Sequence, residues 1–363
     1  MRILFLVHPL QDYVSDPLYL GLVRLLGQEN VVDYPSKAIL HDPSAKLWFL
    51  PQIPARPHTE EEVQTLVADG FFDLVCLASF GPENLWTLSR LFNREKFPPI
   101  AYIDGADDVR IRHDVVRRYS VSVYFKRDYV CGVHGRASDF WAFARLFRLD
   151  RALFNRTFPL PLSMAVDALP QFGSITKEID VSFTGRASHP RRAKAVDILS
   201  RMKGVRVSAA VYASHGDRRY KLKAGGLERL FTKLWDNTRA SEADQELKKA
   251  PGDYYREIAA SKIALALRGG GRCPSLRYFE IVGMGTMLLS DMPETLTPND
   301  FVDRRHAIFC KPDLGNLDAL VRHYVREEGE REAIAAEGRA HLLKYHTCER
   351  RAEYFLDICR RVL

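Results

Sequence analysis

Short apolar runs alternate with helical patterns along most of the 363 residues, and this alternation constrains the fold more than any other feature. The runs include RILFLV at residues 2–7, PPIAYIDG at 98–105, VSVYFKRD at 121–128 and IALAL at 263–267. Strands that are apolar throughout are typical of parallel sheets whose two faces are both covered by helices. The sequence therefore predicts an α/β protein with doubly covered, parallel sheets.

The alternation lapses in a proline-rich stretch near residues 156–178 and then resumes, which predicts a hinge between two Rossmann-like domains. We expect the first domain over 1–165 and the second over 166–348. Residues 349–363 form a last helix, for which packing back on the first domain is one arrangement. Paired domains of this kind hold a ligand in the cleft between them, at the carboxyl ends of the strands.

Composition narrows the class of protein but does not choose a partner. Hydrophobic residues make up 46% and charged residues 27%, as in ordinary globular proteins. No apolar run is long enough to span a membrane, and six scattered cysteines without a C-x-x-C pair favour reduced thiols in the cytoplasm. The net charge of +7 suits nucleotide phosphates, anionic lipid or nucleic acid, or simply a solvated basic surface.

Two glycine–arginine loops follow strands of the second domain. In FTGRASHPRR, Gly185 allows close approach of the backbone, and Arg186, Arg191 and Arg192 follow, the last two opening a helix. In RGGGRCPS, Gly270 frees the chain between Arg268 and Arg272. Glycine turns, arginines and helix N-termini together predict an anion site, although a tight turn with exposed arginines explains the first loop equally well.

The helix predicted after the second loop carries a lone carboxylate. Ser275 is expected near its N-cap, and Arg277, Tyr278 and Glu280 lie in its first two turns. Arg277 and Glu280 are three residues apart, so an ion pair within the helix is one interpretation. The other is that Glu280 accepts hydrogen bonds from ribose hydroxyls, a task that suits a group with two accepting oxygens.

These residues resemble a known signature. The stretch EIAASKIALALRGGGRCPSLRYFEIVGMGTMLLSD is similar to the donor-binding region of GT-B glycosyltransferases, of the bacterial group 1 type with spore-maturation and exostosin-like relatives. The resemblance implies a nucleotide-sugar donor in the second domain, with Glu280 at the ribose. It also implies that Gly185, Arg186 and the Arg268–Arg272 loop face the diphosphate.

One position departs from the family pattern. Many retaining members carry a second glutamate eight residues before the ribose-binding one, and here that position is Arg272. An arginine there is suited to neutralise the leaving diphosphate. The chain has no D-x-D triplet and its histidines form no ligand set, so we expect neither a metal nor a cofactor.

A catalytic base is expected from the first domain, at the ends of its strands. Asp104 ends a buried strand and Asp107 follows it, where clustered carboxylates raise one another's pKa. Capping of the next helix explains Asp107 equally well. Asp12 and His8, which follow the first strand, are the rival candidates.

Residues 136–156 combine five arginines with several aromatic side chains. Phe140, Phe143, Phe147 and Phe154 fall close to one helical face, beside Trp141. Packing into the core of the first domain is one interpretation, and contact with an anionic membrane surface is the other.

The expected function is transfer of a sugar from a UDP- or GDP-linked donor to an acceptor such as a glycan or lipid-linked sugar, without metal. We expect a cytoplasmic protein, with peripheral contact at the inner face of the membrane as an option. The alternatives are a nucleic-acid-binding or nucleic-acid-modifying protein of the same fold and a nucleotide-sugar epimerase.

Overall fold

The computed structural model describes residues 1–7, 11–42, 49–53, 57–78, 87–88, 90–91, 98–131, 136–212 and 251–363. The chain divides into two compact units. Unit 1 comprises residues 1–168, 294–300 and 344–363, and unit 2 comprises residues 169–293 and 301–343. The boundaries differ from the uninterrupted second domain expected over 166–348, because the chain returns twice to the first unit.

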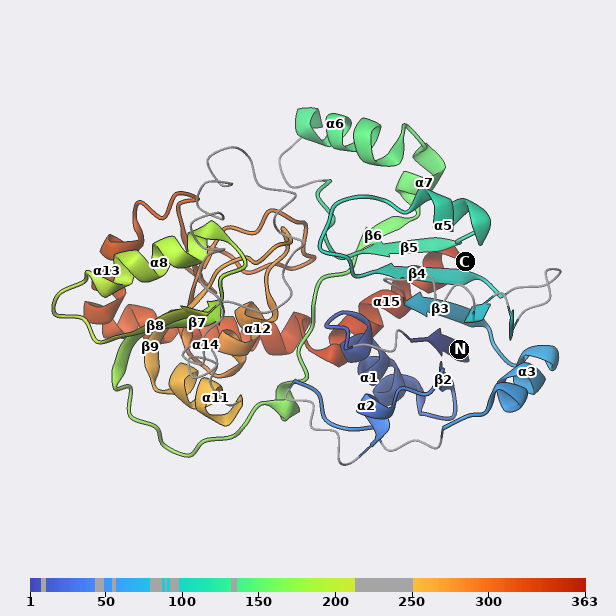
Figure 1. The fold of residues 1–363 in the computed structure, drawn as a ribbon, viewed down its shortest axis with the longest axis horizontal. Helices are drawn as coiled ribbons and strands as arrows, with labels where there is room; N and C mark the ends of the chain where they lie inside the picture. Colours follow the sequence, from blue (N-terminus) through green and yellow to red (C-terminus); the bar gives the residue numbers. More distant parts are fainter. Residues whose placement is uncertain are drawn as a thin grey trace. The chain divides into compact units, whose positions relative to one another are not determined.

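Unit 1 is built on a six-stranded sheet with the order β2-β1-β3-β4-β5-β6, in which all neighbours are parallel (Figure 1). Helices and strands alternate along unit 1, as the sequence pattern predicts. They are β1 (Ile3–Leu6), α1 (Ser15–Leu26), β2 (Val31–Tyr34), α2 (Ala38–His41), α3 (Glu60–Ala68), β3 (Leu74–Ala78), β4 (Ile100–Asp104), α5 (His113–Arg118), β5 (Val123–Lys126), α6 (Arg136–Phe147), α7 (Arg151–Asn155), β6 (Thr157–Pro159), a 3₁₀ turn (Val166–Ala168) and α15 (Cys348–Val362).

The start of the expected proline-rich linker is a strand. Thr157 to Pro159 form β6, which pairs with β5 at the edge of the first sheet. An edge strand tolerates Pro159 because one side of it needs no ladder hydrogen bonds. The stretch GPENLWTLSRLF at residues 81–92, whose pattern predicts a helix, lies largely outside the described residues.

The last helix packs within unit 1, against α1. The two helices approach so closely that a Cβ added at Gly21 would lie 2.2 Å from the carbonyl oxygen of Cys348. Arg24 on α1 holds Glu349 and Asp167 through contacts of 2.5 Å each. Residues 294–300 join the same unit, where Leu296 N–H donates to Tyr129 O at 2.7 Å.

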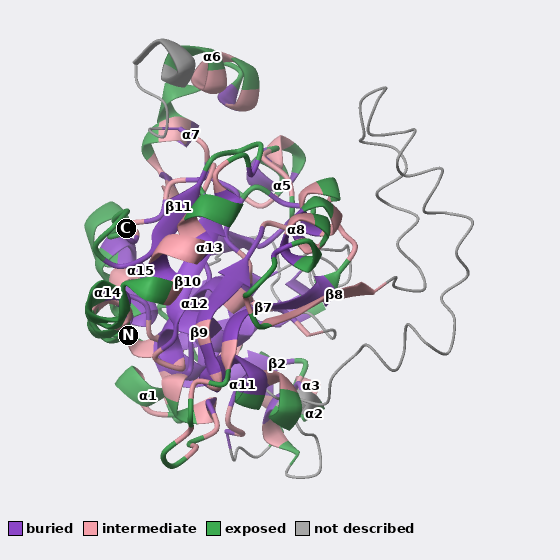
Figure 2. Cartoon of the chain, turned by 90° about the vertical axis from the view of Figure 1, so that its left-hand side faces the viewer, coloured by how far each residue is buried: buried purple, intermediate pink, exposed green. Residues whose placement is uncertain are grey.

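Unit 2 contains a five-stranded parallel sheet with the order β11-β10-β9-β7-β8. In Figure 2 β9 and β10 are buried, whereas β8 at the sheet edge is only partly covered. The elements are β7 (Ile179–Arg186), α8 (Pro190–Ser200), β8 (Val207–Tyr212), α11 (Pro251–Ala259), β9 (Ser261–Ala266), α12 (Leu276–Gly283), β10 (Met287–Asp291), β11 (Ile308–Cys310), α13 (Leu317–Arg326) and α14 (Glu328–Tyr345).

The core of unit 2 comes from the inward faces of these strands and from α8, α13 and α14. Val181, Ile263, Leu265, Leu289 and Val321 are among its buried members. Burial of apolar area at about 25 cal/mol per Å² is the main force that holds such a layer together. The packing fixes the strand ends, from which the loops of the candidate site emerge.

Candidate donor site

Three neighbouring strands of the second sheet end side by side at its carboxyl edge. β7 ends at Arg186, β9 at Ala266 and β10 at Asp291. Because β9 is hydrogen-bonded to both β7 and β10 in parallel, the loops that follow these strands emerge side by side. Both glycine–arginine loops predicted from the sequence are therefore neighbours, and Asp291 lies beside them.

Arg192 fastens the two loops to each other. Its guanidinium donates to the carbonyl oxygens of Arg186 at 3.1 Å, Leu267 at 2.7 Å and Arg268 at 3.0 Å. Arg192 is buried; its bond to Leu267 is buried too, and the bonds to Arg186 and Arg268 are partly buried. A planar guanidinium with five donors is well suited to hold several carbonyls at once. Arg192 thus acts as a structural clamp beneath the loops.

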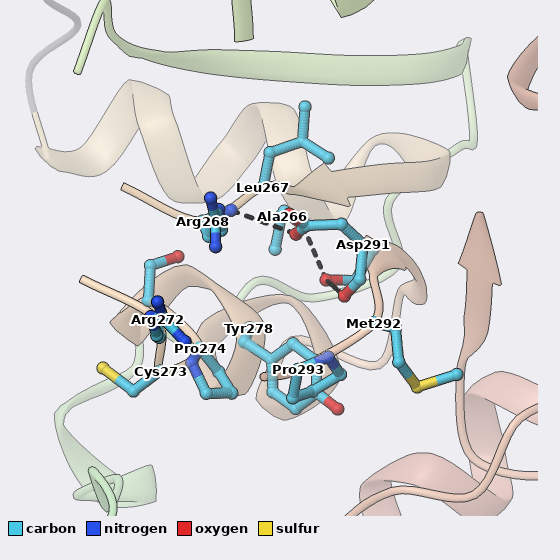
Figure 3. A pocket seen from close by; sticks show the side chains of 12 residues that line it. Ala266, Leu267, Arg268, Arg272, Cys273, Pro274, Tyr278, Asp291, Met292 and Pro293 are labelled. Atoms are coloured by element: carbon cyan, nitrogen blue, oxygen red, sulfur yellow. Dashed lines mark hydrogen bonds between the residues drawn. The ribbon is translucent and has the colours of Figure 1, made fainter. Parts of the chain in front are cut away.

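Asp291 also holds groups from both loops. Its carboxylate accepts from Arg191 Nη1 at 2.8 Å and from the backbone N–H of Arg268 at 3.0 Å. Figure 3 shows Asp291, Arg268, Arg272 and Tyr278 around a small hollow of about 10 Å³. The lining residues are Ala266, Leu267, Arg268, Arg272, Cys273, Pro274, Ser275, Tyr278, Ser290, Asp291, Met292 and Pro293.

His189 is a member of this edge that sequence reasoning missed. It is the N-cap of α8, where its Nδ1 accepts from the backbone N–H of Arg191 at 3.2 Å. Arg268 Nη2 lies 3.1 Å from its Nε2. Burial, and then the charges of Arg268, Arg191 and Arg192, lower the pKa of His189 to about 4. The ring is therefore neutral at neutral pH, as a group among arginines should be.

Glu280 is neither solvated nor directly paired with Arg277, the two states expected for the empty protein. Its carboxylate is 2% exposed and accepts from Tyr254 Oη at 2.7 Å and Tyr255 Oη at 3.0 Å. Arg277 Nε donates to the same Tyr254 hydroxyl at 2.9 Å, so this hydroxyl lies between the two charges. Desolvation by burial raises the pKa of Glu280, while hydrogen bonds from the tyrosines and the charge of Arg277 oppose the rise.

Gly185 makes the close approach that the sequence predicts, and the neighbour is a side chain of the protein itself. A Cβ at this position would lie 2.7 Å from Nη1 of Arg277. The Arg277 guanidinium also lies over the rings of Phe183 and Tyr254, at 5.4 and 5.3 Å from their centroids. Any side chain at position 185 would push Arg277 away from the end of β7.

The other predicted donor-site residues differ in exposure. Arg186, Gly270 and Arg272 are exposed, and Ser275 is the N-cap of α12 although its side chain makes no capping bond. Tyr278 is buried, with its ring 5.1 Å from that of Phe301. The edge thus combines arginines available to solvent with a buried layer that positions them.

Asp104, at the end of β4 in unit 1, forms a buried ion pair with Lys126. Lys126 Nζ lies 2.9 Å from its Oδ2, the Tyr124 hydroxyl donates to the same oxygen, and Ala106 N–H donates to Oδ1 at 3.1 Å. Asp104 and Lys126 are each 1% exposed. A carboxylate held this way is stabilised as a structural anion.

The remaining base candidates have separate surroundings. Asp12 is buried and accepts from the backbone N–H groups of Val14 and Ser15 at the start of α1, at 2.7 and 3.1 Å. Asp107 is 59% exposed and pairs with Arg127. His8 lies outside the described residues.

Two general features complete the description. Among the residues that the structure describes, no group of three or more His, Cys, Asp or Glu side chains is arranged to hold a metal ion. Within the same residues, none of the helices combines the length and the apolar character needed to cross a membrane.

Comparison with known proteins agrees with this geometry. Residues 195–357 match the family model described as glycosyl transferase-like, which covers most of unit 2. No curated protein matches the chain. The chain has two parallel-stranded α/β units, the arrangement of the GT-B fold, and solved glycosyltransferases share it. Residues 195–357, somewhat less than half of the chain, are similar to the glycosyl transferase-like family.

Solved structures share the fold over the whole chain. HepE from Anabaena, in complex with UDP and glucose, has a TM-score of 0.59 at 13% identity and covers 99% of this chain and 100% of its own. Sucrose-phosphate synthase from Thermosynechococcus elongatus has a TM-score of 0.56 at 11% identity, with 99% of both chains covered. AviGT4, a glycosyltransferase involved in avilamycin A biosynthesis, has a TM-score of 0.52 at 16% identity, with 100% of this chain and 98% of its own covered. Neither a nucleic-acid protein nor an epimerase is supported by these matches.

Proposed function

We propose that the chain transfers a sugar from a nucleoside diphosphate sugar held at the carboxyl edge of the second sheet. The arginines at that edge carry the proposal, because Arg186 and Arg272 are exposed beside Arg268 and the buried clamp Arg192. Charge of this kind stabilises a diphosphate leaving group as the glycosidic bond breaks. UDP is the first choice of nucleotide, since HepE was solved with UDP and with UDP-glucose, and GDP is the second.

The proposed chemistry needs no metal ion. Guanidinium groups and backbone N–H groups supply the positive charge that a divalent cation would otherwise provide. The loop residues Arg268 and Arg272 line the hollow together with Tyr278 and Asp291. In this proposal Arg272 takes the position at which many retaining relatives carry a glutamate, and it faces the diphosphate.

Glu280 is proposed to hold the ribose. A carboxylate has about four lone-pair sites, and the two tyrosines use one on each oxygen. Each oxygen can therefore accept one further hydroxyl, as the two ribose hydroxyls require. Because Glu280 is buried, the half-buried Tyr254 must move aside for the ribose to reach it.

We infer that the acceptor is activated from unit 1. Asp107 is the exposed member of the three described base candidates, so we assign it this role, and His8 stays a prediction. A general base contributes about 10²–10⁴-fold to a rate. Replacement of Asp107 by Asn should thus lower kcat at least about 100-fold while the free energy of unfolding stays unchanged.

A reducing compartment suits the thiols. All six cysteines are free and buried, so we propose that the protein works in the cytoplasm, where nucleotide sugars are also made.

Calorimetric titration with UDP, and then GDP, in excess EDTA tests this function. We expect saturable binding of one of them in the absence of metal. Binding that disappears with EDTA and returns with Mn²⁺ would overturn the metal-free proposal. Failure of both nucleotides to bind under either condition would overturn the donor site itself.

A further inference from the structure

The helical pair α6 and α7 of unit 1 carries a surface that the transfer reaction does not use. In Figure 1 the pair lies beyond the strands β4, β5 and β6, and in Figure 2 much of α6 is exposed. The core interpretation of residues 136–156 holds for three of the phenylalanines. Phe147 is buried, and Phe143 and Phe154 pack against it with ring centroids 6.3 and 5.1 Å away.

The packed side anchors the pair to unit 1. The three phenylalanines join the hydrophobic core of the first sheet, and His113 Nε2 of α5 lies 2.8 Å from the carbonyl oxygen of Leu146. Asp150 caps α7 by accepting from the backbone N–H of Leu153 at 2.9 Å. These contacts hold the two helices in place against unit 1.

Other side chains of the pair expose large apolar groups. Phe140 is 56% exposed, Trp141 72% and Leu149 60%. Leu149 and its neighbour Arg148 have φ angles of 61° and 52°, in the left-handed region that such residues seldom adopt. The turn thus holds a leucine out into solvent at a conformational cost, and strain of this kind is typical of functional surfaces.

Exposed arginines accompany these apolar groups. Arg145 lies one helical turn after Trp141, and Arg148 and Arg151 follow in and after the turn; all three are exposed. Among the described side chains of the pair, the acidic one is Asp150, which caps α7. Tryptophan, leucine and arginine in this arrangement match a bilayer interface with anionic headgroups, because the rings enter the acyl boundary while the guanidiniums remain at the phosphates.

We propose that the α6–α7 surface, comprising Phe140, Trp141, Arg145, Arg148, Leu149 and Arg151, binds the surface of an anionic lipid bilayer. The proposal stands independently of the donor site. It commits to a bilayer and not to nucleic acid, since exposed leucine at a turn adds nothing to binding a phosphate backbone but contributes directly to insertion.

Vesicle co-sedimentation tests it, with the whole chain and vesicles of phosphatidylcholine with or without phosphatidylglycerol. We expect binding to the anionic vesicles that weakens as salt rises. The variant Trp141→Ser/Leu149→Asn should bind roughly tenfold or more weakly, because apolar insertion is lost. Asn tolerates a positive φ, so this variant should fold as the wild type does.

A charge-matched pair of variants sharpens the result. Arg145→Glu/Arg148→Glu should lower the partition coefficient by roughly fivefold or more per residue. Arg326→Glu/Arg360→Glu changes the net charge equally at exposed arginines elsewhere and should bind nearly as wild type does. Absence of vesicle binding, or equal weakening by both pairs, would overturn the proposal. Binding to poly(U) that depends on the arginines, combined with indifference of vesicle binding to Trp141→Ser/Leu149→Asn, would assign the surface to nucleic acid instead.

Discussion

The carboxyl edges of the two sheets hold their charges in opposite ways. At the first sheet, Asp104 and Lys126 neutralise each other in a buried pair, as do Asp16 and Lys37, which are both 1% exposed and 2.6 Å apart. Among the described residues at the carboxyl edge of the second sheet, arginines outnumber carboxylates, and the buried Arg192 donates to three backbone carbonyls.

This difference suggests that charged groups at the strand ends serve different purposes in the two units. A buried ion pair satisfies both partners and leaves nothing for a ligand, so it serves the fold. A cationic edge whose own buried acceptors are mostly backbone carbonyls keeps net positive charge, so it suits a polyanion such as a diphosphate. The contrast is the reason that we propose the donor site in unit 2.

The largest loss of stability is expected from breaking a buried ion pair in the first unit. Lys126→Met leaves Asp104 buried and uncompensated, and should cost about 3–5 kcal/mol in the free energy of unfolding. Urea denaturation measures it. The double variant Asp104→Asn/Lys126→Met should recover most of the loss. No recovery would mean that packing around Lys126, and not its charge, is what matters.

A smaller loss is expected at the clamp of the second unit. Arg192→Leu leaves one buried and two partly buried carbonyls without their donor and should destabilise the protein by about 3 kcal/mol. It should also weaken nucleotide binding, because the loops after β7 and β9 lose their common anchor. Arg272→Ala is the matched control at an exposed position, where we expect weaker binding and an unchanged urea midpoint. If Arg192→Leu left the midpoint unchanged, the clamp would be disproved.

The smallest of these effects follows from His189. Its folded-state pKa of about 4 is below the unfolded value of about 6.5. The unfolded chain therefore binds more protons between these pH values, and the contribution of His189 to stability is full above pH 6.5 and is lost as pH falls. Allowing for solvent screening, we expect on the order of 1 kcal/mol. His189→Asn, which keeps a helix cap, should flatten the stability profile between about pH 6.5 and 4; a profile identical to that of the wild type would contradict the account.

The fold was predictable because its signal is local. Apolar runs such as residues 121–128 and 263–267 predict buried strands, and their alternation with helices predicts parallel sheets. The short strand β6 was missed because Thr157–Pro159 gains its ladder from β5, which lies some thirty residues earlier. The intrinsic strand propensity of three residues, one of which is a proline, cannot show such pairing.

The loops of the candidate site could be predicted from the sequence, but the residues that contact Glu280 could not. Arg268, Arg272 and Glu280 stand out because glycines and a lone carboxylate mark them in the sequence. The hydroxyls of Tyr254 and Tyr255 reach Glu280 from another helix, 26 and 25 residues away, and no spacing rule relates them. Asp291 had a usable signal, since an acid that ends a buried strand lies at the same edge as the loops.

The most direct test of the donor site compares two ligands in two proteins. Calorimetry in EDTA would measure UDP and 2′-deoxy-UDP against the wild type and Glu280→Gln. Charge-assisted hydrogen bonds contribute about 1.5–3 kcal/mol, so the variant should bind UDP about tenfold or more weakly. It should lose much less affinity for 2′-deoxy-UDP. Equal losses for both ligands, or a collapse of stability in the unliganded variant, would show that Glu280 only supports Tyr254 and Tyr255 and does not read the ribose.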